Sequence, residues 1–266
     1  VRPQGRNISD KEPNRPQVPI IQHADVKRML LFQKSITEGS LALLIFCGLL
    51  GDKLSQESEP QKKAEMEALL DLLIPIAKSY PSEMGVQSTS MAIQVLGGAG
   101  YTTDFPVEQY YREARIHPIH EGTTGIHGLD LLGRKMLLHE GLGWKMLQKE
   151  FQSTLKEAKS LPELGEIALT FEKYAQEFAS GTAQLLFKRN QGPEYYLADA
   201  TLYLEGAGLL CMGWMWLKQA ITAQKALNSG SKEQDFHLGK IETARYTVAY
   251  ELVKLKGIVE RFESTN

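Results

Sequence analysis

Apolar residues recur at helical spacing along almost the whole chain. Between His23 and Lys53 they stand three or four positions apart, the period of one buried helix face. Clusters of Gly, Pro and Ser separate this segment from others like it. The pattern predicts helices at about 23–53, 61–79, 83–96, 106–115, 123–138, 145–160, 163–190, 194–228 and 234–263.

Prolines and glycines are expected to interrupt these helices. Pro75 and Pro81 lack the amide N–H that a helix interior needs, so we expect a kink or a break there. Gly141 and Gly143 mark a boundary between two modules. Because no alternating strand pattern is found, the predicted fold class is all-α, with a helical bundle at 21–140 followed by a second helical module at 141–266.

Composition adds little beyond exclusions. The chain is 42% hydrophobic and 23% charged, with a formal net charge of -2, which argues against nucleic acid as a partner. The apolar run 209–217 is about half as long as a bilayer span requires, so we predict a buried helix and no integral membrane segment.

Cys47 and Cys211 are predicted to be reduced core thiols. Trp214 and Trp216 are interpreted as core packing, with an oligomer interface as the alternative.

A glycine-rich turn follows the helix that contains Gln94. Gly97, Gly98 and Gly100 fit either a helix C-cap with a tight turn or a close approach of the backbone to a ligand. The dinucleotide-binding fingerprint does not apply, because its third glycine and the preceding strand are both missing.

Glu121 stands immediately before a predicted helix. It is either a carboxylate favoured by the helix dipole or a general base on a loop. His117, His120 and His127 lie nearby, but their order with Glu121 matches no known zinc motif, so we predict no metal site.

Together these segments resemble the acyl-CoA dehydrogenase family. The family pattern is a Gln-x-x-Gly-Gly-x-Gly-Tyr turn, a Pro-Val-Glu helix, a Tyr/Met-Arg-Asp-Ala-Arg/Lys-Ile segment and an Ile-Tyr-Glu-Gly-Thr loop. The matching residues are QVLGGAGY at 94–101, PVE at 106–108, YREARI at 111–116 and IHEGT at 119–123. The resemblance covers residues 1 to about 138. Residues 145–266 resemble a helical extension found in the branch that includes 3-methylmercaptopropionyl-CoA dehydrogenase-like enzymes.

This resemblance implies that the chain is the C-terminal part of a longer enzyme. Its first residues, VRPQGR, resemble a segment that follows the family's β-domain, so residues 1–20 are expected to be a linker from that domain. In the family the arginine at the position of Arg2 reaches the flavin of a neighbouring subunit. Since FAD lies between the β-domain and the helical bundle, we expect the isolated chain to bind FAD weakly or not at all and to be inactive.

The reaction implied is FAD-dependent oxidation of an acyl-CoA to a trans-2-enoyl-CoA. Glu121 is the implied catalytic base, and its backbone N–H helps to stabilise the thioester oxygen. The resemblance also implies FAD contacts: Thr123 and Thr124 match positions that touch the flavin, Gln94, Gly97 and Gly98 match a turn that lies along the FAD of the partner subunit, and Arg2 reaches the flavin of a neighbouring subunit. Three departures from the family pattern are His120 for Tyr, Glu113 for Asp, and Gly125 for a polar residue. The first leaves pocket shape open and the last removes an expected flavin contact.

The resemblance also implies partners. These are an acyl-CoA substrate, an electron-transfer flavoprotein as acceptor, and further copies of the chain in a homodimer or homotetramer. The expected location is a bacterial cytoplasm, with the mitochondrial matrix as the alternative. The competing hypothesis is a non-catalytic helical interaction or oligomerisation module. The carboxylate of Glu121 and the Gly97-Gly98 turn favour the enzyme.

Overall fold

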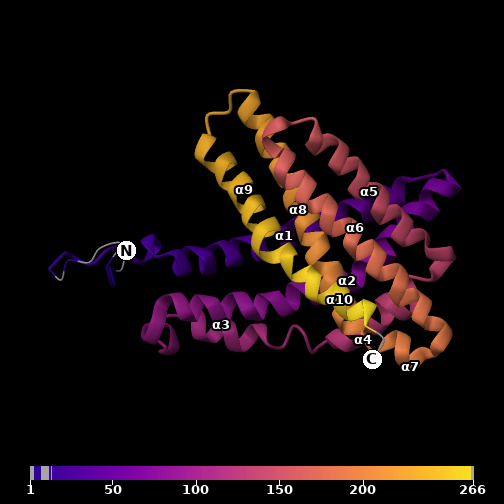
Figure 1. The fold of residues 1–266 in the computed structure, drawn as a ribbon, viewed down its shortest axis with the longest axis horizontal. Coiled ribbons are helices and arrows are strands. Elements are labelled where there is room, and N and C mark those ends of the chain that lie inside the picture. The colour runs from indigo at the N-terminus through magenta and orange to yellow at the C-terminus, as the bar shows by residue number, and fades with distance from the viewer. Residues whose placement is uncertain (1–2, 7–11, 13, 265–266) are drawn as a thin grey trace.

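The computed structural model describes residues 3–6, 12 and 14–264, and it is helical almost throughout (Figure 1). Within those residues the β pairing is limited to an isolated bridge between Pro3 and Pro19. The predicted all-α fold is therefore confirmed. The α-helices are α1 (Ala24–Gln56), α2 (Pro60–Leu96), α3 (Val107–Ala114), α4 (Thr124–Asp130), α5 (Leu142–Lys159), α6 (Gly165–Phe187), α7 (Pro193–Leu197), α8 (Ala200–Asn228), α9 (Gln234–Tyr246) and α10 (Leu255–Glu263).

The long helices α1 and α2 pack against each other over much of their length. A short turn separates them, and Pro60 begins α2 at a position where a proline loses no helical hydrogen bond. α3 folds back beside the C-terminal part of α2 (Figure 1). α2 is therefore the element against which the glycine-rich turn and the segment containing Glu121 are both built.

A break at Pro75 and Pro81 is not found, because α2 continues through both residues, while the kink that we gave as the other possibility stays a prediction. Each proline removes one main-chain hydrogen bond, which in an isolated helix would cost about 3 kcal/mol. Here the helix is held from outside by burial of the residues around the first proline. The side chains that supply this packing are Leu72, Leu73 and Ile76, none more than 1% exposed.

Two predicted helices in the second half are interrupted. Residues 194–228 divide into α7 and α8 at Asp199, whose carboxylate binds Arg261 of α10 at 3.1 Å. Residues 234–263 contain a π-helical turn that begins at Thr247. The hydroxyl of Thr247 donates to the carbonyl of Thr243 at 2.8 Å, and such competition for a helix carbonyl perturbs the regular ladder.

The core is centred on α8. Every residue from Gly206 to Leu217 is buried, including Cys211, which is a free thiol. Trp214 donates its indole N–H to Thr154 at 2.9 Å, and Trp216 donates to the carbonyl of Ser35 at 2.8 Å. The core interpretation of both tryptophans is confirmed, and their burial excludes the exposed interface that we had considered for them.

The predicted module boundary near Gly141 falls in a tight connection between the two halves. Gly141 and its two predecessors, His139 and Glu140, all have positive φ. The buried side chains before and after this connection nevertheless form one continuous apolar cluster, with α8 packed on α1, α2 and α4. The division into 21–140 and 141–266 stays a prediction about domains, while the packing is shared.

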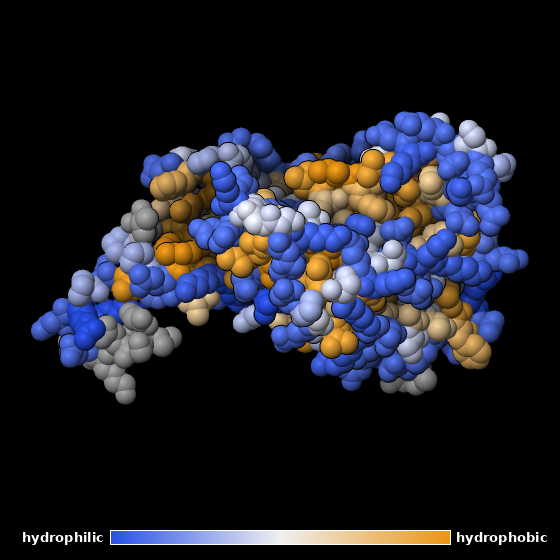
Figure 2. Space-filling model, turned by 90° about the horizontal axis from the view of Figure 1, so that it is seen from above, coloured by the Kyte–Doolittle hydropathy of each residue, from blue (hydrophilic) through white to orange (hydrophobic). Residues whose placement is uncertain are grey.

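The surface is not uniformly polar. Figure 2 shows apolar residues gathered between polar ridges on the face seen from above. α1 exposes Leu41, Leu44, Ile45 and Leu49 on one face. Of the helices within the described residues, α1 is the one with the length and composition of a membrane span. Its most apolar 18-residue window has a mean hydropathy of 1.4, and 33% of that window is buried. A core helix of a soluble protein meets the same criterion, so this finding does not place α1 in a membrane.

Candidate active site

The loop between α3 and α4 presents Glu121 to solvent. Its backbone has a φ of 54°, in the left-handed region, and Gly122 follows with a φ of 94°. A residue with a side chain rarely adopts such a φ, and where one does the surrounding structure must hold it there. The Glu121 side chain is exposed, so the strain is not explained by packing of the carboxylate.

Gly122 is required for two reasons. Its positive φ favours glycine, and a Cβ on it would lie 2.9 Å from Nε2 of His127. That imidazole nitrogen lies 3.1 Å from the carbonyl oxygen of Glu121, within hydrogen-bond distance. A larger residue at position 122 would therefore displace the ring that contacts the Glu121 backbone.

Lys78 of α2 reaches the same loop from the other side. Its ammonium donates to the carbonyl oxygen of His117 at 3.0 Å and to that of Gly122 at 2.6 Å. These two carbonyls bracket Glu121 in the chain. The sequence contained no signal for this contact, because the partners are 39 and 44 positions apart.

Thr123 and Thr124 lie at the start of α4. Thr123 occupies the N-cap position without a side-chain capping hydrogen bond, and it is exposed. Thr124 donates its hydroxyl proton to Glu83 of α2 at 2.5 Å. Behind this contact is a cavity of about 140 Å³ whose wall includes Tyr80 and Thr201, so the base of the loop meets both α2 and α8.

The glycine-rich turn lies at the end of α2. Gly97 has φ 62° and ψ -145° and is the C-cap of α2, which agrees with the helix-cap interpretation of this turn. Gly97 and Gly98 are exposed, and a Cβ on either would meet nothing within 4 Å. Gly100 is different, because its Cβ would lie 2.7 Å from the carbonyl oxygen of Ile93. Thus Gly100 is needed for internal packing, whereas Gly97 and Gly98 leave bare backbone open to a ligand.

The structure groups the predicted site residues into two places. Glu121, Thr123 and Thr124 share one loop, whereas Gln94, Gly97 and Gly98 share the end of α2. Gln94 is eleven residues beyond Glu83, or about 16 Å along the helix axis. The predicted flavin contact Arg2 lies outside the residues that the structure describes.

The two groups of residues have the open backbone and the polar atoms that contact with a flavin would require. The open backbone at Gly97 and Gly98 admits a flat ligand, the exposed Gln94 and Thr123 offer polar atoms beside the two groups, and Thr124 already donates its proton to Glu83. Within the described chain no group of three or more His, Cys, Asp and Glu side chains gathers as a metal site would require.

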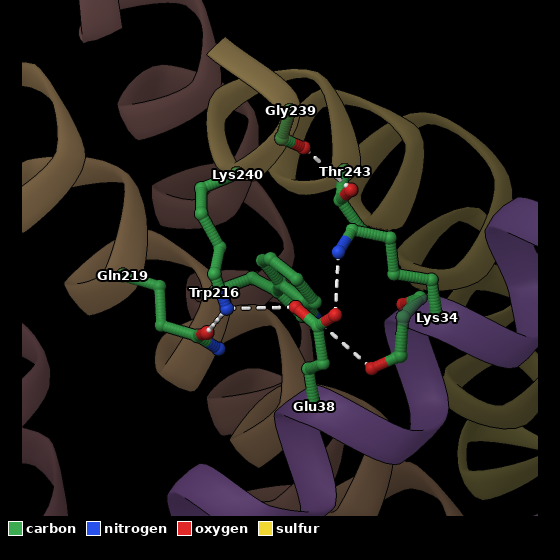
Figure 3. A network of polar contacts seen from close by, with 8 residues as sticks. Lys34, Glu38, Trp216, Gln219, Gly239, Lys240 and Thr243 are labelled. Atoms are coloured by element: carbon green, nitrogen blue, oxygen red, sulfur yellow. Dashed lines mark hydrogen bonds and ion pairs between the residues drawn. The ribbon is translucent and has the colours of Figure 1, made fainter. Parts of the chain in front are cut away.

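A larger apolar groove of about 470 Å³ lies elsewhere, between α1, α8 and α9. One side is bordered by the polar network of Figure 3, in which Glu38 accepts hydrogen bonds from Lys34 and from Lys240. Lys240 also binds Gln219 at 2.9 Å and lies over the ring of Trp216. None of the groove residues belongs to the Glu121 loop or to the glycine-rich turn, so its size does not make it the candidate active site.

The family models and the most similar curated proteins agree on one family. Residues 14–137 match the family described as "Acyl-CoA dehydrogenase, C-terminal domain", and residues 147–266 match "Acetyl-CoA dehydrogenase C-terminal like". The chain is 34% identical to 3-methylmercaptopropionyl-CoA dehydrogenase of Ruegeria pomeroyi, over 93% of this chain and 42% of that protein. It is 32% identical to a butyryl-CoA dehydrogenase of Syntrophomonas wolfei, over 89% of this chain and 39% of that protein.

Solved structures show the same fold. The chain superimposes on an acyl-CoA dehydrogenase complexed with FAD from Bacillus anthracis with a TM-score of 0.63 at 16% identity, over 95% of this chain and 42% of that one. For Caenorhabditis elegans ACDH-11 in complex with C11-CoA the TM-score is 0.61 at 23% identity, over 82% and 35% of the two chains. The chain spans about two fifths of the length of the curated relatives that it matches. It belongs to the acyl-CoA dehydrogenase family, of which it carries the C-terminal helical portion.

Proposed function

We propose that this chain is the C-terminal portion of an FAD-dependent acyl-CoA dehydrogenase in which Glu121 removes the α-proton of the substrate. The observation that carries the proposal is the state of Glu121 itself. Its carboxylate is exposed on a loop whose backbone is held in the left-handed region. Within the described chain its amide N–H donates to no backbone acceptor, so both the base and a hydrogen-bond donor remain available to a ligand.

The chemistry follows from these two groups. A thioester carbonyl acidifies the hydrogens on its α-carbon, and a carboxylate placed beside that carbon can take one as a proton. The electron pair left behind moves toward the carbonyl, so negative charge develops on the thioester oxygen. The free N–H of Glu121 is suited to stabilise that charge, because a fixed donor needs no reorganisation.

The cofactor contributes the second half of the oxidation. When bound, FAD would supply the acceptor for the β-hydrogen and its electron pair, so that loss of a proton and a hydride would leave a trans-2-enoyl-CoA. In this chain Thr123 and Thr124 would contact the flavin, with Thr124 positioned by Glu83, and Gln94, Gly97 and Gly98 would lie along the FAD of a partner subunit. Arg2 is proposed to contact the flavin of a neighbouring subunit.

The substrate class is supported by the relatives. Those from Ruegeria pomeroyi, Syntrophomonas wolfei and Mycobacterium tuberculosis are each named for a CoA thioester, with different acyl groups. We therefore propose an acyl-CoA as substrate and leave the acyl group unassigned. By the same family argument we propose an electron-transfer flavoprotein as acceptor, a homodimer or homotetramer, and a bacterial cytoplasm.

The test compares wild type with Glu121→Gln in the full-length polypeptide that contains this chain. Acyl-CoAs of several lengths are added without oxygen, and bleaching of the flavin absorbance is followed. Loss of a general base should slow bleaching by about 100- to 10,000-fold while FAD stays bound. Glu140→Gln is the control, since Glu140 is another exposed glutamate with positive φ outside this loop. Equal rates for wild type and Glu121→Gln would overturn the proposal and favour the non-catalytic module.

A further inference from the structure

The position of Glu121 depends on a side chain from another helix. We infer that Lys78 is a positioning residue for the base, because its ammonium fixes the backbone on both sides of Glu121. This inference rests on the proposed function. It extends that function to a residue that is far away in the sequence and that contacts only the main chain of the loop.

The loop backbone needs an external restraint. Glu121 and Gly122 have positive φ in succession, at 54° and 94°. Glycine adopts such angles freely, but glutamate avoids them, so a free loop would return Glu121 to negative φ. That rotation would change the direction of both its side chain and its N–H. A device that holds this turn therefore holds the base and the hydrogen-bond donor together.

Lys78 has the geometry of such a device. Its carbonyl partners, His117 and Gly122, lie on opposite sides of Glu121, at 3.0 and 2.6 Å from the ammonium. Two attachments on opposite sides of one residue restrict rotation between them, whereas a single attachment would leave the turn free to pivot. An ammonium has three donors, and these contacts use two of them.

The charge of Lys78 is directed at the loop alone. Within the described residues, the ion pairs of α2 are made by Lys62, Glu65 and Asp71, and none includes Lys78. Its hydrogen bonds to the two carbonyls are therefore charge-assisted and not shared with a competing anion. A side chain of similar length without N–H donors would lose both contacts.

The other end of the restraint is equally fixed. Lys78 lies on α2 immediately after the buried residues Pro75, Ile76 and Ala77, so its own backbone is held by core packing. From the opposite side, His127 contacts the Glu121 carbonyl at 3.1 Å, and Glu83 holds Thr124. The turn is thus tied to α2 before and after the base.

The experiment uses the full-length FAD-loaded enzyme and normalises every rate to bound flavin. Lys78→Met removes the donors while keeping the length of the side chain. We expect flavin reduction at saturating acyl-CoA to fall about 10- to 100-fold, the loss typical of hydrogen bonds from a charged donor. The acyl-CoA concentration for half-maximal rate should change by less than about threefold, because Lys78 contacts main chain and not substrate. Deuterium at the α-carbon should slow the variant more than it slows wild type.

Conservative and control variants separate positioning from general damage. Lys78→Arg retains a positive multi-donor group and should recover part of the lost rate. Lys63→Met removes an exposed lysine from the same helix and should leave the rate unchanged. If Lys78→Met loses its flavin or its fold, Lys78→Gln takes its place with the same per-flavin readout, because it removes the charge and its amide nitrogen is one bond closer to the backbone than the lysine ammonium.

The outcomes distinguish the inference from the proposed function. If Glu121→Gln is slow and Lys78→Met reduces flavin at the wild-type rate, the base stands and the role of Lys78 is overturned. The role of Lys78 would also be overturned if Lys78→Met and Lys78→Arg were equally slow and both needed a higher acyl-CoA concentration for half-maximal rate. That result would favour a general structural role. If Glu121→Gln reduces flavin normally, the proposed function fails, and the inference fails with it because there is no base to position.

Discussion

The loop around Glu121 and the central turns of α8 differ in what holds them in place. The loop is exposed, and its conformation depends on a few polar contacts that end on main-chain carbonyls. The centre of α8 is buried on all sides, and its aromatic side chains pack edge to face against neighbours such as Phe46 and Phe151. The comparison shows that the proposed chemistry and the stability come from different regions. The proposed base lies on a loop with few apolar contacts, and the loop is carried by a helical core that has many.

The largest effect on stability is expected in the α8 core. Trp214→Ala removes a side chain that is 0% exposed, leaves a cavity, and deprives Thr154 of its donor. The free energy of unfolding should fall by about 3–5 kcal/mol, measured by urea denaturation. Phe187→Ala is the control, since Phe187 is equally aromatic but 69% exposed, and it should change little. Similar losses for the two variants would show that α8 is not the centre of stability.

The second prediction concerns the strained loop, where a substitution should raise the free energy of unfolding instead of lowering it. Glu121→Gly removes an exposed side chain at a φ of 54°. Relief of left-handed strain should gain about 1–2 kcal/mol, and the greater flexibility of the unfolded chain should take back about 0.5–1 kcal/mol. Thermal unfolding should therefore show a net gain of up to about 1.5 kcal/mol. Glu121→Gln keeps the Cβ and serves as the control, with stability unchanged; a destabilised Glu121→Gly would contradict the assigned strain.

The smallest effect is expected at the polar network beside the groove. Partial burial raises the pKa of Glu38, but hydrogen bonds and charge from Lys240 and Lys34 outweigh burial and hold it below its ordinary value. A lowered folded-state pKa stabilises the protein above the ordinary carboxyl pKa and loses that contribution as pH falls through the folded value. Because the pair is partly exposed, Glu38→Gln should cost less than about 1 kcal/mol at neutral pH.

The pH dependence of the effect of Glu38→Gln on stability tests this third prediction further. The difference in unfolding free energy between wild type and Glu38→Gln should shrink as pH is lowered below about 4. Glu242→Gln alters a glutamate that is 67% exposed and paired with Arg245, and it should show a smaller difference at every pH. A gap that widens in acid would show that the network does not lower the Glu38 pKa.

The sequence pattern predicted long helices better than their interruptions. The helices at 23–53 and 163–190 agree closely with α1 and α6, because a sustained apolar face is a local signal. The break considered at Pro75 and Pro81 is not found, since the packing that compensates for the two prolines comes from other helices. The π turn at Thr247 depends partly on Ser35, whose hydroxyl lies 2.7 Å away across 212 positions. Neither compensation can be read from the residues nearby.

The candidate site divides in the same way. Glu121 and the glycine-rich turn could be singled out from short motifs and from the resemblance that those motifs carry. Lys78 and Glu83 could not, because a lysine or a glutamate on an amphipathic helix is an ordinary surface residue until the partner loop is placed beside it. What distinguishes them is the position of two carbonyls and one hydroxyl from a segment about forty residues later.

The continuity of α2 through two prolines has a consequence for how this protein tolerates insertions and deletions. One unbroken helix carries Lys78 and Glu83 in its middle and Gln94 at its end, so it sets the spacing between the loop and the glycine-rich turn. Adding or removing one residue between Glu83 and Gln94 would shift that turn by about 1.5 Å and rotate it by about 100° around the helix axis. A length change in the turn between α1 and α2 would leave this spacing intact. Length variation should accordingly be harmful inside this stretch of α2 and much less so in the turn between α1 and α2, although both are far from Glu121 in the sequence.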